Sequence, residues 1–436
     1  MEEQPDRIHR KIINSWCMYD WANSAYATTV MAAMLPPYFS SVAQEAGFTG
    51  AQASSMWGYI TSLTMLIIAL ASPVLGAIAD YTGSKKKFMS GFFIVAVAFT
   101  SLLVFIGTGD WLMCLLFFAL AGIGNAGANV FYDSLLPHIA HSDEIDQVSA
   151  KGYAFGYLGG GLLLIVNLLM FTKPGLFGIP SEEWGIRLSF LSVGIWWVIF
   201  SRPLFRNVPE PPRSSDYVET INPVRAGFQR LGHTFHELRH YKQLLLFLVA
   251  FWLYADGIGT IMKMATIYGT EIGIGMTDLV GALLLTQFVG VPFTFLFGWL
   301  ARKLGTKRSI FLALSVYMLV SIGGYFMTKP LHFWILAFTV GTVQGGSQAL
   351  SRSLFSSMVP KARSAEFFGF FDISSKFAGI AGPLLFGVVG QLTGTSRLSI
   401  VSLVVFFIVG MLLLRNVDEK EGIRIAQEEN RAAGIA

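Results

Sequence analysis

The sequence has few charged residues for its length. Asp, Glu, Lys and Arg make up 13% of its 436 residues, whereas hydrophobic residues make up 53%. A soluble domain is about 25% charged, because its surface faces water. A chain of this size with so little charge cannot cover a soluble surface with polar groups. The shortage therefore indicates that lipid solvates much of the molecule.

Several other features are missing. The only two cysteines, Cys17 and Cys114, lie in apolar segments and provide no disulfide framework. The formal net charge is only +4 and basic residues form no long runs, so no nucleic-acid partner is expected. No Gly-x4-Gly-Lys-Ser/Thr loop occurs, which excludes an ATP-driven pump within this chain. Residues 1–13 are polar and precede no cleavage site, so we expect the first apolar segment to act as an uncleaved signal.

Long apolar runs, by contrast, fill most of the chain. About 20 apolar residues cross the hydrocarbon core of a bilayer as a helix. We predict an all-α membrane protein with twelve transmembrane helices in two pseudo-symmetric six-helix bundles. The predicted spans of the first bundle are 14–38, 54–79, 88–107, 111–135, 152–172 and 186–204. Those of the second are 243–268, 278–301, 309–327, 332–355, 366–391 and 397–415.

The predicted domains follow from these spans. Residues 1–204 form the first bundle, 205–242 a polar linker, 243–415 the second bundle, and 416–436 a tail. Basic residues alternate between the two membrane sides: 24 lie in the tails and loops of one side and four on the other. The positive-inside rule then places both termini in the cytoplasm, and we expect a multi-pass protein of the cell membrane.

A loop sequence repeats in the two halves. Gly76-x3-Asp80-x2-Gly83 precedes the basic residues Lys85, Lys86 and Lys87. At a constant offset of 222 residues, Gly298-x3-Arg302-x2-Gly305 precedes Lys307 and Arg308. The first glycine of each copy permits close helix packing, and the second permits a tight turn. Two matched copies are typical of a transporter built from a duplicated unit.

This loop resembles the signature of the major facilitator superfamily, except that Ser84 stands where the family usually has Arg. The resemblance implies that Asp80 contacts the N-terminus of the eleventh helix and stabilises one gate conformation, as a carboxylate at the positive end of a helix dipole can do. Arg302 replaces the acid in the second copy, so the second gate must be held differently.

Further motifs narrow the resemblance. Helix 1 carries Tyr19-Asp20-Trp21-Ala-Asn23-Ser24, helix 5 begins Lys151-Gly152-Tyr153, and helix 10 contains Gly345-Gly346-Ser347-Gln348. Together these are similar to the vacuolar amino-acid effluxers of autophagy and their bacterial relatives. The resemblance implies transport of a small solute, and more loosely of amino acids. The Gly152-x3-Gly156 pattern of helix 5 resembles an antiporter motif, but Tyr157 replaces its Pro and close packing explains the glycines equally well.

Charged residues within the spans are candidate site residues, because a charge in hydrocarbon costs about 3 kcal/mol or more. Asp20, Asn23 and Ser24 share one face of helix 1. Asp256, Thr260 and Lys263 share one face of helix 7. Asp372 and Lys376 are spaced i, i+4 on helix 11, where they form either a neutralising pair or part of the site. We expect these eight residues to line a substrate or proton cavity, unless Asp20 lies too near the cytoplasmic end.

Other residues are expected at a cytoplasmic gate. Asp133 and Arg352 occupy matching places at the ends of helices 4 and 10. The family resemblance implies that Asp133 reaches the Lys85–Lys87 loop. The alternative is that both side chains simply extend to the interface between membrane and water and have no role in a gate. The full predicted gate set is Gly76, Asp80, Gly83, Lys85, Lys86, Lys87, Asp133, Gly298, Arg302, Gly305, Lys307, Arg308 and Arg352.

The linker contains one pattern of a different class. His236-Glu237-Leu238-Arg239-His240 matches the zinc-protease motif, with His233 one turn earlier. Apolar residues at helical spacing across 222–242 favour instead an amphipathic helix on the membrane surface. Because no third ligand or protected cleft is evident, we expect no enzymatic activity, no metal and no cofactor.

The sequence hypothesis is a secondary transporter that moves a small polar solute, with an amino acid exported as the leading case and protons as a candidate driving ion. Its expected partners are the solute, protons and membrane lipids, and it is expected to be a monomer. A non-transporting receptor or scaffold, or a lipid transporter with the same fold, are the alternatives.

Overall fold

The computed structural model describes residues 3–48, 50–212, 241–271, 274, 276–378, 381–393 and 396–434. Within these ranges the chain forms helices joined by short loops, and no strand occurs among them. The predicted amphipathic helix at 222–242 and the His236–His240 motif lie outside the described residues, apart from Tyr241 and Lys242.

The first half contains six long helical stretches and several short turns. Its elements are α1 (Glu3–Ala25), η1 (Tyr26–Met34), α2 (Leu35–Glu45), α3 (Gly50–Thr82), α4 (Lys85–Leu102), η2 (Leu103–Phe105), α5 (Trp111–Ser134), α6 (Leu136–Ile139), α7 (Ile145–Thr172), η3 (Pro174–Phe177) and α8 (Glu182–Asn207).

The second half repeats this arrangement. Its elements are α10 (Lys242–Glu271), α11 (Met276–Leu304), α12 (Thr306–Tyr325), α13 (Pro330–Met358), η4 (Lys361–Arg363), α14 (Ser364–Phe377), α15 (Ala381–Thr393), α16 (Ser396–Ser402), α17 (Val404–Arg415) and α18 (Glu419–Ala432).

Each predicted span falls on one of these helices or on consecutive helices. Among the described residues, nine stretches are long and apolar enough to cross a membrane, and they coincide with nine of the twelve predictions. The other three are the first, tenth and eleventh spans. Many large apolar side chains on the outer surface are exposed, including Tyr59 (77%), Leu70 (70%) and Leu392 (80%). Such a surface suits lipid rather than water, as expected for a multi-pass membrane protein.

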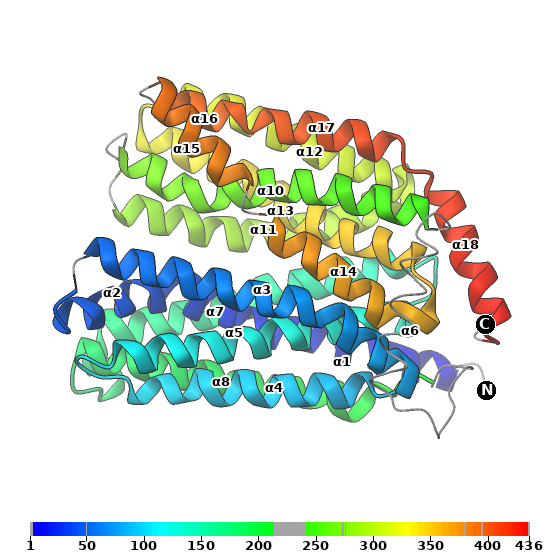
Figure 1. Cartoon of the computed structure of the whole chain (residues 1–436), viewed down its shortest axis with the longest axis horizontal. Helices are drawn as coiled ribbons and strands as arrows, with labels where there is room; N and C mark the ends of the chain where they lie inside the picture. Colours follow the sequence, from blue (N-terminus) through cyan, green and yellow to red (C-terminus); the bar gives the residue numbers. More distant parts are fainter. Residues whose placement is uncertain are drawn as a thin grey trace.

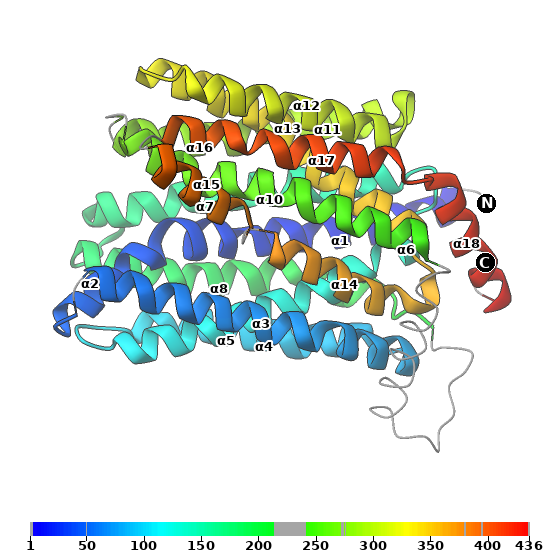
Figure 2. The same cartoon turned by 45° about the horizontal axis from the view of Figure 1, so that its top comes forward.

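Two hydrophobic cores divide the molecule into two bundles. One core draws on residues 13–208 and the other on residues 241–425. Among the described residues, only Ala365 and Val130 belong to the core of the opposite half. The bundles meet where α3 packs on α14 and α7 packs on α11 and α13 (Figures 1 and 2). Both described termini and α18 lie at one end of the molecule, called here the terminal end (Figure 1).

In two of the interrupted spans, the first and the eleventh, proline stands where the helix restarts. The first span passes through a π-helix, η1, and restarts as α2 with Pro36 and Pro37 in its first turn. The eleventh span ends as α14 at Phe377, and α15 begins at Ala381, with Pro383 in its first turn. A proline lacks the amide hydrogen that continues a helix, and its ring clashes with the preceding turn. The second interruption lies beside the cavity described next.

The tail beyond the last span folds back onto the second bundle. Asp418 caps α18 by accepting hydrogen bonds from the amides of Lys420 and Glu421. The Lys361 amide donates to Asn430 Oδ1 (2.7 Å), and the Tyr241 hydroxyl donates to Glu429 Oε1 (2.6 Å). The tail beyond the last span therefore forms a helix across the terminal end. The division of the chain into domains at residues 204, 242 and 415 remains a prediction.

Candidate functional site

A cavity of about 450 Å³ lies between the two bundles. Helices α3, α5 and α7 supply one wall, and α10, α13 and α14 supply the other. Its polar lining comprises Asn129, Asp133, Tyr153, Tyr254, Ser347, Gln348, Ser351 and Asp372. Its apolar lining includes Met65, Phe251, Ile258, Met262, Phe368 and Phe371. The cavity thus offers two acids, two amides, several hydroxyls and an aromatic wall to a small solute.

Neighbouring contacts hold the lining residues in place. Phe251 and Phe371 stack with their ring centroids 4.5 Å apart. The hydroxyls of Tyr254 and Ser351 lie 2.6 Å apart. The Tyr157 hydroxyl donates to Gln348 Oε1 across the bundle interface (2.8 Å). Packed rings and hydrogen-bonded polar groups keep a binding site in one geometry before a ligand arrives.

Arg352 of α13 occupies a buried cluster of charges next to the cavity. Its guanidinium binds Asp133 of α5 at 3.0 Å and Asp20 of α1 at 3.3 Å. It also donates from Nε to Ser149 Oγ and from Nη2 to the Ser149 carbonyl, both at 2.9 Å. One cation of the second bundle therefore faces two carboxylates of the first, which joins the bundles at this point. Asp133 is part of both this cluster and the cavity lining.

Aromatic rings and one glycine shape the surroundings of Arg352. Its guanidinium lies over Tyr153 (4.2 Å to the ring centroid) and Trp16 (4.8 Å). These faces are favourable surroundings for a cation that is only 2% exposed. A side chain at Gly152 would place its Cβ 2.4 Å from Asp20 Oδ2 and 2.9 Å from Arg352 Nη2. The glycine predicted for close packing therefore leaves room for the ion pair.

The first repeated loop joins α3 to α14 at the terminal end. Asp80 accepts hydrogen bonds from the amides of Ala365 (3.2 Å) and Glu366 (2.8 Å), in the first turn of α14. This is the contact with the eleventh span that the resemblance implied. Lys85 lies 2.8 Å from Asp80 Oδ1 and donates to Ser364 Oγ. A carboxylate at a helix N-terminus is stabilised by the helix dipole and by its free amides.

The two glycines of this loop have the predicted uses. A methyl group at Gly76 would lie 2.3 Å from the Ala365 carbonyl oxygen, so only glycine permits this approach of α3 to α14. Gly83 has φ of +61°, and its counterpart Gly305 has φ of +91°. Positive φ values are strained for residues with a Cβ, which accounts for glycine at both turns.

The second repeated loop is held by different groups. Gly298 of α11 faces Ala150 of α7, and Arg302 is largely exposed beside Gln147. Asp146, near the start of α7, accepts hydrogen bonds from Thr306 (2.7 Å) and Ser353. The acid of this second contact therefore stands on the opposite bundle, and sequence comparison of the two loops could not locate it.

Each loop also carries a lysine that fixes the end of its own bundle. Lys86 donates to the carbonyls of Phe205 (3.0 Å) and Val208 at the end of α8. Lys307 donates to the carbonyls of Arg415 (2.8 Å), the last residue of α17, and of Val417 (2.6 Å), just beyond it. Helix C-termini present free carbonyls and attract cations. Lys87 and Arg308 are exposed.

The structure corrects several placements. Asp133 binds Arg352 rather than the Lys85–Lys87 loop, because its side chain faces the second bundle. Asp20 does not line the cavity but lies in the Arg352 cluster, since it stands one turn closer to the terminal end than Asn23. Ser24 faces Gly156 of α7, where a Cβ would lie 2.5 Å from its Oγ. Asn23 donates to the cavity residue Asn129 (2.8 Å) and so supports the lining.

The face of helix 7 that carries Asp256 and Thr260 also points away from the cavity. Asp256 is 1% exposed, accepts a long hydrogen bond from Thr260 (3.4 Å), and does not line the cavity. Both residues face Gly382 of α15, where a Cβ would lie 2.0 Å from Thr260 Oγ1. Asp372 does line the cavity. The side chains of Lys263 and Lys376 lie outside the described residues, so their expected pairing remains a prediction.

Several residues that take part in the contacts between the bundles cannot be recognised from a single sequence. Ser149, Ser364 and Asp146 are ordinary residues near helix starts, and only the docking of the second bundle gives them their roles. Tyr153 and Trp16 belong to the motifs noted above, but their position over a guanidinium could not be read from spacing. A rule that searched for small or acidic residues at the starts of helices would have found Asp146.

Sequence comparison gives a consistent set of relatives. Residues 8–427 match the family described as "Vacuole effluxer Atg22 like". The chain is 41% identical over 420 residues to the "Uncharacterized MFS-type transporter YxiO" of Bacillus subtilis, covering 96% of this chain and 97% of that one. It is 29% identical to autophagy-related protein 22 of Yarrowia lipolytica over 64% of this chain. It spans about half of that fungal protein's length (52%).

Solved structures show the same fold at low sequence identity. A proton:xylose symporter, XylE, superposes with a TM-score of 0.72 at 15% identity, over 97% of this chain and 98% of that one. FucP in an outward conformation superposes with a TM-score of 0.68 at 13% identity, over 94% and 98% of the two chains. Both are members of the major facilitator superfamily by their descriptions, and the likeness is one of fold.

Proposed function

The chain belongs to the Atg22-like vacuole effluxer family and is a secondary transporter of major-facilitator fold, and from this premise we propose that it exports a small polar solute of the amino-acid class in exchange for protons. The observation that carries the proposal is the double position of Asp133. Its carboxylate lines the cavity and also binds Arg352, which joins the two bundles. Whatever neutralises Asp133 from the cavity therefore weakens the contact that keeps the terminal end closed.

The lining suits an amino acid. A cavity of about 450 Å³ lies within the range of about 300–1,000 Å³ typical of small-molecule sites. Asp133 and Asp372 attract an ammonium group, and Gln348, Asn129 and the hydroxyls supply donors for a carboxylate. The aromatic wall accepts an apolar side chain. The interrupted eleventh span adds irregular backbone at the cavity, a feature of transporter binding sites.

In the proposed mechanism, a proton and the ammonium group of the solute compete for the carboxylate of Asp133. A proton reaching Asp133 removes its charge, loosens Arg352 and lets the terminal end open. The proton then leaves, and the ammonium group of the solute takes its place beside Asp133. Proton and ammonium cannot neutralise the same carboxylate together, and this exclusion is the requirement for antiport. From the distribution of basic residues, we propose that the protein lies in the cell membrane with its terminal end facing the cytoplasm. We also propose that it works as a monomer.

The test is transport by purified protein in liposomes. An imposed pH gradient should drive movement of a labelled amino acid, and a panel covering acidic, basic, polar and apolar side chains should identify the preferred class. Asp133→Asn should abolish the gradient-driven component, whereas exchange of labelled for unlabelled solute should persist with a higher KM, because Asp372 still attracts the ammonium group. If folded protein moves none of the panel, the amino-acid assignment is wrong. If transport ignores the pH gradient, the proton coupling is wrong.

A further inference from the structure

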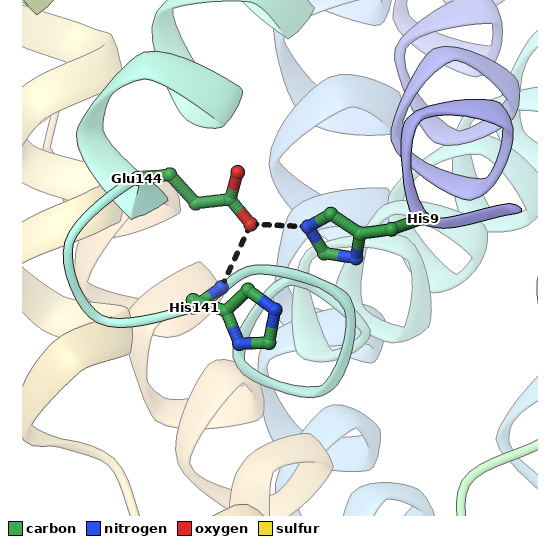
Figure 3. Close-up of side chains that lie close together, drawn as sticks. All are labelled: His9, His141 and Glu144. Atoms are coloured by element: carbon green, nitrogen blue, oxygen red, sulfur yellow. Dashed lines mark hydrogen bonds and ion pairs between the residues drawn. The ribbon is translucent and has the colours of Figure 1, made fainter. Parts of the chain in front are cut away.

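Two histidines and one glutamate converge at the terminal end, outside the cavity and the interbundle contacts. Figure 3 shows His9 of α1 facing His141 and Glu144, which flank the turn between α6 and α7. His9 Nε2 lies 2.5 Å from Glu144 Oε1, and the two imidazole rings stack with centroids 4.6 Å apart. One potential ligand atom from each residue lies within 4.8 Å of the other two. We propose that these three residues form a binding site for Zn²⁺.

The donor set matches the preferences of this ion. Two imidazoles and one carboxylate with an open fourth position form a recurrent zinc site. Imidazole nitrogen is a poor ligand for Mg²⁺ and Ca²⁺ but a good one for Zn²⁺ and its first-row neighbours. The fourth position is available to water, because His141 is exposed and Glu144 and His9 are only partly buried. The ion can therefore enter from solution.

The distances require only side-chain movement. In the tetrahedral geometry that zinc prefers, two donor atoms each about 2.1 Å from the ion are about 3.4 Å apart, so a pair 4.8 Å apart must close by roughly 1.4 Å. His9 and Glu144 must separate to admit the ion, which a rotation of the carboxylate achieves. The turn itself is already ordered. The His141 amide donates to Glu144 Oε1 (3.0 Å), and the Glu144 amide donates to the His141 carbonyl (3.1 Å).

The site would tie two segments that the sequence separates by 132 residues. It would fix the start of α1 to the turn that precedes α7. Asp146, two residues after Glu144, contacts Thr306 and Ser353 of the second bundle. A bound ion would therefore hold one of the two chain segments that meet the second bundle at the terminal end.

The experiment measures zinc bound to the full-length protein, purified in detergent without a polyhistidine tag. The protein is freed of metal with a chelator, mixed with ZnCl₂, passed through a desalting column, and analysed for zinc by mass spectrometry. His9→Gln/His141→Gln and Glu144→Gln disrupt the proposed site. The matched control is His236→Gln/His240→Gln, because the linker histidines are the other plausible ligands in this chain. Size-exclusion profiles and tryptophan fluorescence verify folding.

We expect wild-type protein and the linker variant to retain an equivalent of zinc that both site variants lack. Zinc should also raise the unfolding temperature of the wild type and the linker variant, but not of the site variants, because an ion that binds only the folded state stabilises it. The proposal is overturned if the site variants bind as much zinc as the wild type, or if only the linker variant loses it. In that case His9 and Glu144 form a metal-free ion pair.

Discussion

Arg352 and Asp133 bind each other across the two bundles, with 3.0 Å between Nη1 and Oδ1. They stand at matching positions near the ends of α13 and α5. The same position of the repeated helix therefore carries an acid in the first bundle and a base in the second. A buried ion pair of this kind contributes little net stability, but the loss of one partner leaves an uncompensated charge. The pair is therefore suited to a contact that must break and re-form during a transport cycle.

Arg352→Gln should open the terminal end. The change leaves Asp20 and Asp133 without their cation, a cost of about 3–5 kcal/mol for a buried pair that loses one partner. Arg352→Lys should give an intermediate effect, because lysine keeps the charge but cannot reproduce the planar fork of contacts. The measurement is maleimide labelling of Ala150→Cys, which lies buried against Gly298. Cys17 and Cys114 are buried and give little background.

The control for this prediction is Arg308→Gln, which removes an exposed cation from the same end. It should leave labelling of the Ala150→Cys reporter unchanged. Equal labelling of the Arg352→Gln and Arg308→Gln proteins would show that Arg352 does not hold the bundles together.

Gly76→Ala should also disfavour the closed terminal end. Alanine in a helix is ordinarily preferred over glycine by about 1 kcal/mol. At Gly76, however, the added methyl would lie 2.3 Å from the Ala365 carbonyl oxygen, a backbone atom that cannot rotate away. The matched control is Gly91→Ala on α4, where no atom lies within 4 Å of the added methyl. Transport rate and reporter labelling should change at Gly76 alone, and equal behaviour of the two variants would contradict the close approach of α3 to α14.

Asp80→Asn should weaken the same contact by a different route. The carboxylate accepts from two amides of α14 and also binds Lys85, whereas an amide keeps one acceptor and places an NH₂ group against donors. Loss of a cap costs about 1 kcal/mol, and loss of the charged partner adds to it. We expect slower transport and a larger labelled fraction of the reporter at unchanged abundance. Unaltered labelling would mean that Asp80 does not stabilise the closed end.

The sequence predicted the spans and the repeat because each depends on local composition or on one short motif, whereas the Asp80 contact was implied by the family resemblance of that motif. The placement of Asp20, Asp133 and Asp256 depended instead on how far each residue lies along its helix and on the rotation of that helix. One residue of helix rotation turns a side chain by about 100°, so a face assigned from i, i+4 spacing has no absolute direction. Asp256 and Thr260 do share a face, as predicted, but it points to α15. His9, His141 and Glu144 were missed because no local pattern joins them.

Asp372→Asn and Asp256→Asn should separate solute binding from folding. Asp372 lines the cavity, so its neutralisation should raise the KM for an amino-acid solute and leave the unfolding temperature nearly unchanged. Asp256 is buried against α15 and bonded by Thr260, so its replacement should lower the unfolding temperature and the amount of folded protein. A hydrogen bond to a charged group is worth about 1.5–3 kcal/mol, which is enough to detect. Initial transport rates across a range of solute concentrations, normalised to folded protein, give the comparison. If Asp256→Asn raised the KM while Asp372→Asn did not, the binding site would lie on the α15 side of α10, and the cavity between the bundles would no longer be its location.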